Sequence, residues 1–403
     1  MRSDLIARIN TDALIHNLHA LTALCGSGVR FCAPLKANAY GHGAAIVAPA
    51  LAAASVDFAA VATVIEGIEL RDLGWTGDIL VLGNVLAVAD EAERRERLTA
   101  ASERRLAMTL VDRQIVEWVG RCPPARPVDV HVKVDTGMGR MGAMPEDVRS
   151  LVRAVRQAGG LRLTGIYSHF ATADFALQDV ARRQLAAFQL LLDSLDGELP
   201  PGTLRHVANS AATITMPDAH FDMVRPGLAL YGYPPSAAMG ERINLCPILR
   251  LVSHLSSVKR LPAGHGVGYG QTFTTHRETR VGLIPVGYFD GFLRSLSNLA
   301  IVTTPHGEAP VIGRVSMDQL AVDLTDLAEM AVGTPIALID DAPHSRNSVV
   351  SLAEQMGTIP YEVTCLLGPR IDRVAVVQAA VAPAAGYRSS RPTPRAVRQP
   401  SAT

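Results

Sequence analysis

Lys36 directly follows residues 31–35, a short apolar run of the kind that forms a buried strand. An ammonium group at the end of such a strand loses hydration, and this desolvation lowers the pKa of a lysine. A neutral lysine amine can form a Schiff base with an aldehyde cofactor. A lysine standing alone would more simply extend its charged end into solvent, so the surrounding residues must decide between the two interpretations.

The segment around Lys36 is LKANAYGHG, residues 35–43. It resembles the cofactor-attachment segment of the alanine racemases, which bind pyridoxal 5'-phosphate. Further motifs of that family follow in the family's order, at residues 131–140, 167–170, 208–210, 225–227, 268–270, 287–288 and 316–319. The resemblance covers most of residues 1–380. It implies a racemase (an isomerase) that interconverts L-alanine and D-alanine, either to supply D-alanine for peptidoglycan or in alanine catabolism.

The resemblance assigns the two proton transfers of racemisation to Lys36 and Tyr269. Racemisation removes the Cα proton from one face of a planar carbanion and returns a proton to the other, so it needs acid–base groups on both faces. Lys36 would hold the cofactor as an aldimine and act on the D-alanine side, and Tyr269 would act on the L-alanine side. Because a tyrosine is a weak base at neutral pH, its phenolate needs support. The family pattern implies a chain from Arg225 through His169 to Tyr269.

The resemblance also implies a set of cofactor-binding residues. Arg225 would face the pyridine nitrogen, where a cation disfavours ring protonation and weakens the electron sink. His169 would stack against the ring. The phosphate would be bound by Tyr40, Ser210, Tyr361 and the backbone amides of Gly227 and Leu228.

Substrate-site residues are implied in both halves of the chain. Arg140 would contact the cofactor and the substrate carboxylate. Lys133 matches a lysine that is carbamylated in many family members, which turns a cation beside Arg140 into an anion that pairs with it. The pocket would be completed by Met317, Asp318 and Tyr288. In the family, Tyr269 and Met317 reach the barrel of the other subunit, so the resemblance implies a homodimer with composite sites.

Eight short apolar runs alternate with helical patterns in the first part of the chain. They lie at residues 31–35, 58–62, 79–82, 106–110, 128–134, 161–167, 204–207 and 221–224. Helical periodicity between them, as at 87–98, 145–158 and 177–195, predicts an α/β fold, a (β/α)8 barrel of the TIM type. A doubly wound sheet is the alternative, but no GxGxxG segment follows any of these runs.

We expect three parts in the chain. Residues 1–235 form the cofactor-binding barrel, with residues 1–10 packing against the second domain and with Thr11 and Asp12 capping the first helix. Residues 236–382 form a mostly-β domain that supplies Tyr269 and Met317. Its strand-like runs are 249–258, 281–286, 300–303, 311–315, 320–324 and 336–339, with a helical stretch at 351–356. Residues 383–403 have four arginines and no acid, which predicts a disordered basic tail.

Composition narrows the functional classes. The 38 Lys and Arg balance the 38 Asp and Glu, which argues against a nucleic-acid binder. Five scattered cysteines without a CxxC pair indicate a reducing compartment and no structural zinc site. The most apolar window, residues 43–65, is interrupted by Pro49 and Asp57, so no membrane span is expected. We therefore predict a cytoplasmic protein that binds no metal.

Alternative functions stay open at this point. A racemase acting on serine or on several amino acids is the nearest, since Phe289 and Leu293 stand where the family usually has Ala and Pro. A decarboxylase of related fold is disfavoured by the Tyr269 motif and by Arg225. A non-catalytic pyridoxal-phosphate carrier built on the same barrel would lack the β domain that residues 236–380 indicate.

Overall fold

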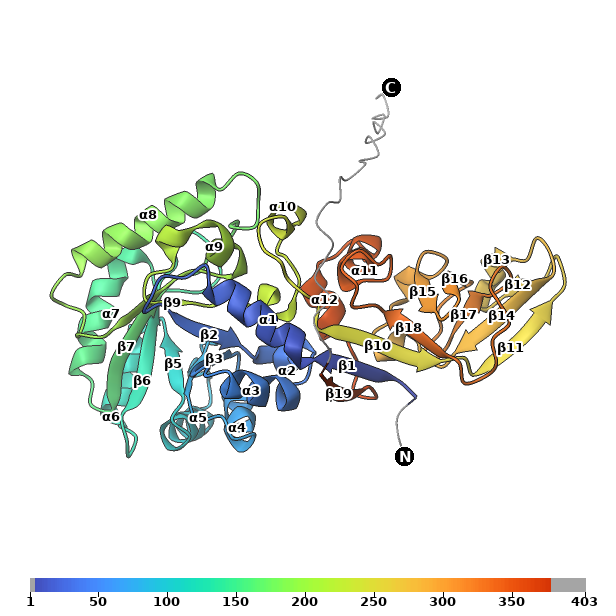
Figure 1. Ribbon diagram of the computed structural model, residues 1–403. Coiled ribbons are helices and arrows are strands. Elements are labelled where there is room, and N and C mark those ends of the chain that lie inside the picture. Colours follow the sequence, from blue (N-terminus) through green and yellow to red (C-terminus); the bar gives the residue numbers. More distant parts are fainter. Residues whose placement is uncertain (1–3, 378–403) are drawn as a thin grey trace, which may run out of the picture.

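A computed structural model describes residues 4–377 of the chain, and the tail expected at residues 383–403 lies outside the described residues. Two units lie side by side (Figure 1): a barrel of parallel strands surrounded by helices, and a second domain built mainly from strands. This confirms the predicted fold class, a (β/α)8 barrel followed by a mostly-β domain.

All eight apolar runs form strands, each within two residues of its expected bounds. They are β2 (Arg30–Pro34), β3 (Phe58–Val61), β4 (Asp78–Val81), β5 (Ala107–Leu110), β6 (Val128–Lys133), β7 (Leu161–Tyr167), β8 (Leu204–His206) and β9 (Met223–Val224). Their order in the sheet is β8-β7-β6-β5-β4-β3-β2-β9, and each hydrogen-bonded pair is parallel. Most of their residues are buried because helices cover one face and side chains fill the other.

One aspartate closes the barrel between β8 and β9. The backbone N–H of Asp222 donates to the Arg205 carbonyl at 3.0 Å. Its carboxylate accepts the backbone N–H of Arg205 and both arms of the Arg205 guanidinium at 2.7 to 2.9 Å. Further along, the Arg225 N–H donates to the Ala208 carbonyl at 2.9 Å. These bonds take the place of a strand ladder, and they fix Arg225 at the end of β9.

Helices cover the outside of the barrel and connect its strands. They are α1 (Thr11–Thr22), α2 (Lys36–Tyr40), α3 (Ala44–Ala53), α4 (Val64–Asp72), α5 (Glu91–Glu103), α6 (Arg113–Arg121), α7 (Pro145–Gln157), α8 (Asp179–Ser194), α9 (Ser210–Thr215), η1 (Pro217–Ala219), η2 (Leu228–Tyr231) and α10 (Ala237–Gly240). Asn10, and not Thr11 or Asp12, caps α1, because its side chain accepts the N–H groups of Asp12 and Ala13. Within residues 4–377, no helix is both long and apolar enough to cross a membrane.

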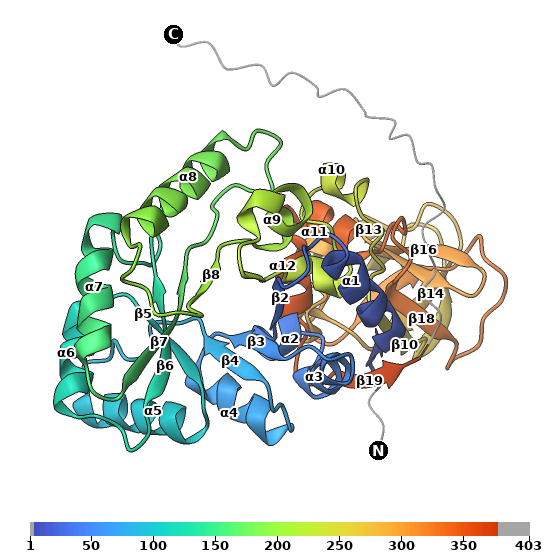
Figure 2. The same ribbon diagram turned by 60° about the vertical axis from the view of Figure 1, so that its left-hand side comes forward.

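A nine-stranded sheet forms most of the second domain (Figure 2). Its order is β11-β14-β17-β16-β15-β18-β10-β1-β19, and β12 and β13 form a separate pair. The bounds are β1 (Ile6–Asn10), β10 (Leu249–His254), β11 (Ser257–Leu261), β12 (Gly266–Val267), β13 (Phe273–Thr274), β14 (Thr279–Ile284), β15 (Ile301–Thr304), β16 (Gly307–Ile312), β17 (Leu320–Asp323), β18 (Pro335–Ile339) and β19 (Asp372–Val376). The run expected at 249–258 is two strands, separated by residues 255–256.

Short helices complete this domain. They are η3 (Tyr269–Gln271), η4 (Tyr288–Asp290), η5 (Arg294–Leu296), α11 (Val349–Met356) and α12 (Pro360–Cys365). Helix α12 was not expected from the sequence. It packs against α2 of the barrel, so residues of the second domain contact the segment that follows Lys36.

Asn17 joins α1 to the segments that follow the barrel. Its buried amide donates to the carbonyls of Leu230 and Cys246 at 3.2 and 2.8 Å, and its carbonyl oxygen accepts the Cys246 N–H at 2.8 Å. Leu230 belongs to η2, and Cys246 lies just before β10. One side chain thus satisfies three backbone groups at the junction of the two units.

We expect Asn17→Ala to lower the free energy of unfolding by about 2–4 kcal/mol, because it removes three buried hydrogen bonds to backbone groups. Urea unfolding followed by circular dichroism measures the change. His19→Ala, on the exposed side of the same helix, is the matched control and should shift the midpoint little. An equal effect of both substitutions would contradict this role.

Candidate active site

The barrel gathers most of the expected site residues at the carboxyl ends of its strands. Lys36 follows β2 after one residue, Lys133 ends β6, and Arg225 directly follows β9. His169 lies two residues beyond the end of β7. This end of a TIM-type barrel is where catalytic groups lie in such enzymes, and electrostatic interactions link His169 to Lys36, Lys133 and Arg225.

A left-handed turn follows Lys36. Ala37, Asn38, Ala39 and Tyr40 have φ between 52° and 55°, so α2 is a left-handed turn rather than a right-handed helix. This conformation costs about 1–2 kcal/mol per residue that is not glycine. Side chains support it: the Glu66 carboxylate accepts the Ala37 N–H, and the Asn38 side chain accepts the Ala44 N–H, both at 2.7 Å.

The turn brings Tyr40 back beside Lys36. The Lys36 Nζ lies 5.8 Å from the centre of the Tyr40 ring. Gly41 ends the turn with φ 82°, and a Cβ there would lie 1.9 Å from the Thr364 carbonyl oxygen of α12. Only glycine allows both this backbone angle and this close contact.

Hydroxyl and amide groups gather beside the turn. A Cβ on Gly227 would lie 2.6 Å from the Tyr40 hydroxyl, so glycine lets that hydroxyl reach the backbone. Ser210 Oγ accepts the Ala229 N–H at 3.2 Å. Ser210 and the Leu228 backbone are the polar groups that act on the Tyr361 hydroxyl and moderate its pKa.

Burial raises the pKa of Tyr361 to about 12, and it raises the pKa of Tyr40 further. Both phenols are therefore protonated at neutral pH and can donate hydrogen bonds. Neutral hydroxyl donors and backbone amides that converge on one place suit a phosphate group. The residues found here are those expected from the sequence to bind the cofactor phosphate.

Positive charge is concentrated around Lys36. Burial first, and then Arg140, lowers the pKa of Lys36. The same two causes, in the same order, lower the pKa of Lys133 to about 8. Nearby carboxylates are held by backbone amides: Glu66 by residues 37, 62 and 63, and Asp135 by residues 137–139. The site therefore suits an anionic ligand, and its positive charge favours deprotonation of the Lys36 amine.

Two buried histidines continue inward from Arg225. The Arg225 guanidinium donates to His206 Nδ1 and, at 2.9 Å, to the Ser168 carbonyl. Because His206 Nδ1 accepts, its Nε2 carries the proton and donates to His131 Nδ1 at 2.8 Å. Burial first and then Arg225 lower the pKa of both rings, that of His131 to about 3. Both are therefore neutral, and Arg225 keeps its full positive charge.

His169 faces the same guanidinium from the other side. Its Nδ1 lies 3.4 Å from Arg225 Nη2. Burial, followed by Arg225 and Arg140, lowers the pKa of His169 well below its usual value, so the ring is neutral. The structure thus contains the first step of the expected chain from Arg225 to Tyr269.

The contact between His169 and Tyr269, the last step of this series of residues, does not occur within one polypeptide. Tyr269 lies in η3, between β12 and β13, which Figure 1 shows at the end of the second domain away from the barrel. Its side chain is 73% exposed, and that of Met317 is 51% exposed. Asp318 forms an ion pair with Arg370 at 2.8 Å, and Tyr288 donates its backbone N–H to the Ser316 carbonyl.

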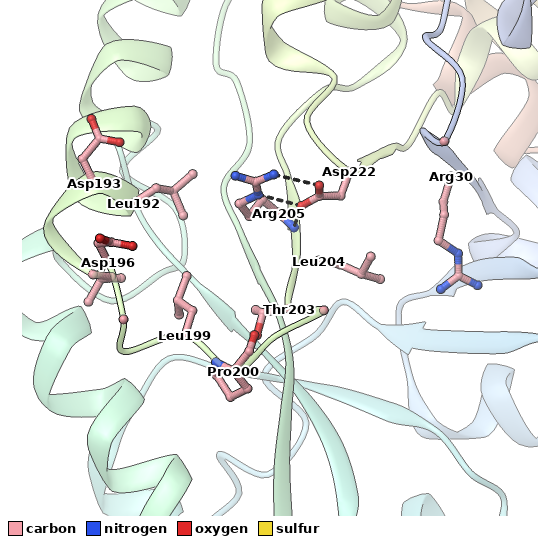
Figure 3. Close-up of a pocket in the computed structure, with 14 residues that line it drawn as sticks. Arg30, Leu192, Asp193, Asp196, Leu199, Pro200, Thr203, Leu204, Arg205 and Asp222 are labelled. Atoms are coloured by element: carbon pink, nitrogen blue, oxygen red, sulfur yellow. Dashed lines mark hydrogen bonds and ion pairs between the residues drawn. The ribbon is translucent and has the colours of Figure 1, made fainter.

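The opposite end of the barrel has a cavity of about 700 Å³ (Figure 3). Arg30 and Leu204 begin β2 and β8, and Asp222 directly precedes β9, so the cavity lies at the amino ends of the strands. Its arginines are paired, Arg205 with Asp222 and Arg30 with Asp57 and Asp78. We therefore assign these groups to barrel closure rather than to chemistry.

Two supporting residues were missed by the sequence analysis. Glu66 accepts a backbone N–H of the left-handed turn. From the sequence, its position three residues after Thr63 indicates only a capping role at the start of a helix. His206 holds Arg225, and the available signal was its position just before the motif at 208–210. Neither signal shows which distant residue the side chain contacts.

Comparison with known proteins identifies the family. Residues 9–235 match the alanine racemase N-terminal domain, and residues 248–375 match the alanine racemase C-terminal domain. The chain belongs to the alanine racemase family. Alanine racemase 2 of Caldanaerobacter subterraneus subsp. tengcongensis is 35% identical, over 93% of this chain and 95% of its own. The alanine racemase of Symbiobacterium thermophilum is 37% identical, over 91% and 96%.

Solved structures of the family have the same fold. Alanine racemase from Clostridium difficile 630 superposes with a TM-score of 0.86 at 33% identity, covering 94% of this chain and 97% of that one. The Bacillus anthracis alanine racemase with bound L-Ala-P gives 0.85 at 30% identity, covering 95% and 97%. The resemblance to alanine racemases seen in the sequence motifs is confirmed.

The neutral histidines predict a dependence of stability on pH. In the folded protein the pKa of His131 and of His206 lies below the value near 6.5 expected for the unfolded chain. At a pH between the folded and unfolded pKa values, the unfolded chain therefore binds more protons than the folded protein. The free energy of unfolding should therefore fall as pH drops below 6.5, by up to about 1.4 kcal/mol per pH unit for each ring. Denaturant unfolding between pH 7.5 and 4.5 measures this slope.

His131→Asn should flatten that slope, because it removes one ring while keeping an acceptor for His206. His19→Asn, which leaves both buried rings in place, is the control. If His131→Asn kept the slope of the unsubstituted protein, the buried pair would not be its source.

Proposed function

We propose that this protein is an alanine racemase that interconverts L-alanine and D-alanine and holds pyridoxal 5'-phosphate on Lys36. The observation that carries the proposal is the position of Lys36. Its half-buried amine, with a lowered pKa, lies at the carboxyl end of β2 beside Tyr40 and within the field of Arg140 and Arg225. Family membership over both domains supports the same reaction.

The residues around Lys36 fit this cofactor. The hydroxyls of Tyr40, Ser210 and Tyr361 and the amides of Gly227 and Leu228 would bind the phosphate. His169 would pack against the ring, and Arg225 would face the ring nitrogen. When bound, pyridoxal phosphate delocalises the electron pair left on Cα after proton loss. The positive charge of Arg225, maintained by neutral His206, opposes protonation of the ring nitrogen and so favours return of the proton over side reactions.

Two side chains move the Cα proton. Lys36 removes or returns it on one face of the substrate, and burial and Arg140 lower the pKa of its amine, which makes the amine easier to deprotonate. Tyr269 acts on the other face, and His169 with Arg225 supports its phenolate. Arg140 binds the substrate carboxylate. Tyr288 and Tyr361 narrow the entrance and favour a small side chain, although size alone discriminates weakly.

A second copy of the chain would supply Tyr269. Within one chain, Tyr269 and Met317 are exposed on the second domain, and Tyr269 lies between β12 and β13, at the end of that domain away from the barrel. An isologous homodimer would place these residues, with Asp318 and Tyr288, at the barrel of the partner. The exposed positions of Tyr269 and Met317 support this arrangement.

We further propose that Lys133 is carbamylated. Its amine is buried, its pKa is lowered to about 8, and its charged neighbours include Arg140, Arg225 and Lys36. The neutral amine forms an N–C bond with carbon dioxide and releases a proton to solvent, so the ammonium cation with which it is in equilibrium is replaced by a carbamate anion. That anion would accept hydrogen bonds from Arg140 and hold it toward the substrate.

Deuterium exchange tests the reaction. We expect the cofactor-loaded protein in D2O to convert L-alanine to D-alanine labelled at Cα, with at least tenfold less D-serine formed from L-serine. Chiral chromatography with mass spectrometry measures both products. Comparable D-serine would assign the broader racemase, and absence of exchange with both substrates, despite bound cofactor, would favour a carrier.

Subunit mixing tests the composite site. Lys36→Ala and Tyr269→Phe should each be almost inactive in racemisation. An equal mixture after subunit exchange should recover about a quarter of the original activity, because half of the dimers are hybrids with one intact site of two. The Lys36→Ala, Tyr269→Phe double variant mixed with unsubstituted protein controls for exchange. No recovery in exchanged dimers would place both residues in one chain's site.

A further inference from the structure

His42 and Tyr231 hold the backbone on both sides of Lys36. The Tyr231 hydroxyl donates to the Pro34 carbonyl, two residues before Lys36, at 2.7 Å. The His42 Nδ1 lies 2.9 Å from the Ala39 carbonyl, three residues after Lys36. The two rings stack at 4.5 Å with 10° between their planes, and both side chains are fully buried.

The bond partners fix the state of His42. A carbonyl oxygen can only accept, so Nδ1 carries the proton and donates to Ala39. The other ring nitrogen, Nε2, is buried without a hydrogen-bond partner. Arg373 is the charged group that faces this region, and its guanidinium donates to the Gly41 carbonyl at 2.7 Å. A protonated ring would bury an unpaired N–H donor beside this cation, so His42 is neutral.

The backbone between these two hydrogen bonds has a conformational cost, because it includes consecutive left-handed residues other than glycine. Four left-handed residues lie between Lys36 and Gly41. The Ala39 carbonyl inside the turn accepts both the His42 backbone N–H at 3.0 Å and the His42 ring. Tyr231 also packs against Tyr40, with ring centres 5.1 Å apart, so its ring lies against the last left-handed residue of the turn as well as against His42.

We propose that His42 and Tyr231 are positioning residues that lock the left-handed turn, and so hold Lys36 and Tyr40 in the arrangement that binds an aldehyde phosphate. Neither side chain need touch the ligand: Tyr231 acts through the Pro34 carbonyl, and His42 acts through the Ala39 carbonyl. We call the two hydrogen bonds, from Tyr231 to Pro34 and from His42 to Ala39, the clamp. The identity of the aldehyde as pyridoxal phosphate rests on the proposed function, whereas the clamp rests on these backbone contacts alone.

Four variants of the full-length protein separate the clamp from simple packing. Tyr231→Phe removes only the hydroxyl that binds Pro34. His42→Leu removes the donor to Ala39, and His42→Asn keeps a donor near the place of Nδ1. Tyr233→Phe is the matched control, because the Tyr233 hydroxyl is equally buried but has no hydrogen-bond partner.

Titration of each cofactor-free variant with pyridoxal phosphate, followed by visible absorbance and borohydride trapping on Lys36, is the first measurement. We expect Tyr231→Phe and His42→Leu to bind the cofactor about tenfold more weakly, the effect of losing one buried hydrogen bond. His42→Asn should stay within about threefold, and Tyr233→Phe should be unchanged. Equal weakening in His42→Asn and His42→Leu, or unchanged binding in Tyr231→Phe, would overturn the clamp.

Amide hydrogen exchange of residues 36–43 without cofactor is the second measurement, and it does not depend on the proposed function. Exchange there should be at least tenfold faster in His42→Leu and Tyr231→Phe than in Tyr233→Phe. If the unsubstituted protein failed to bind pyridoxal phosphate, the proposed function would fail while faster exchange would still support the clamp. Unchanged exchange in both variants would refute the clamp whatever the cofactor.

Discussion

The concentration of positive charge at one end of the barrel is the constraint on which the rest of the site depends. Lys36, Lys133, Arg140 and Arg225 come from three separate segments, with Lys133 and Arg140 at the end of β6 and in the loop after it, and each affects the ionisation of another. Such a cluster is stable only if some members are neutral or if anions bind among them. The lowered pKa values of the two lysines and the neutral state of His169 are the protein's part of that compensation. The phosphate and carboxylate groups of cofactor and substrate would complete it.

The same constraint explains why the interior beneath the site is polar. Arg225 is buried, and a buried guanidinium needs acceptors that do not neutralise it. His206 and the Ser168 carbonyl supply them without adding negative charge. A carboxylate in place of His206 would satisfy the same donors but would cancel the positive charge of Arg225. Neutral acceptors therefore preserve that charge, on which the proposed role of Arg225 depends.

The barrel strands could be predicted because each is a short apolar run between turn residues, and burial alone selects such runs. The motif residues could be predicted because family members share them. What sequence reasoning missed depends on distant contacts. The left-handed backbone of Ala37 and Ala39 contradicts the local preference of alanine and is supported by contacts with Glu66 and α12. Likewise Asn10 rather than Thr11 caps α1, because β1 already fixes Asn10 in an extended conformation.

The position of β1 has a consequence for the order of folding. This strand lies between β10 and β19, so the second domain includes residues that are synthesised before the barrel. Thr11 Oγ1 donates to the Val376 carbonyl across 365 residues of sequence. At about 5–20 residues per second, the ribosome needs roughly 20–70 s to make the intervening chain. For most of that time neither β10 nor β19 has been made, so β1 has no strand to pair with. The barrel can therefore form first, and β1 joins the sheet of the second domain only when its neighbours have been synthesised.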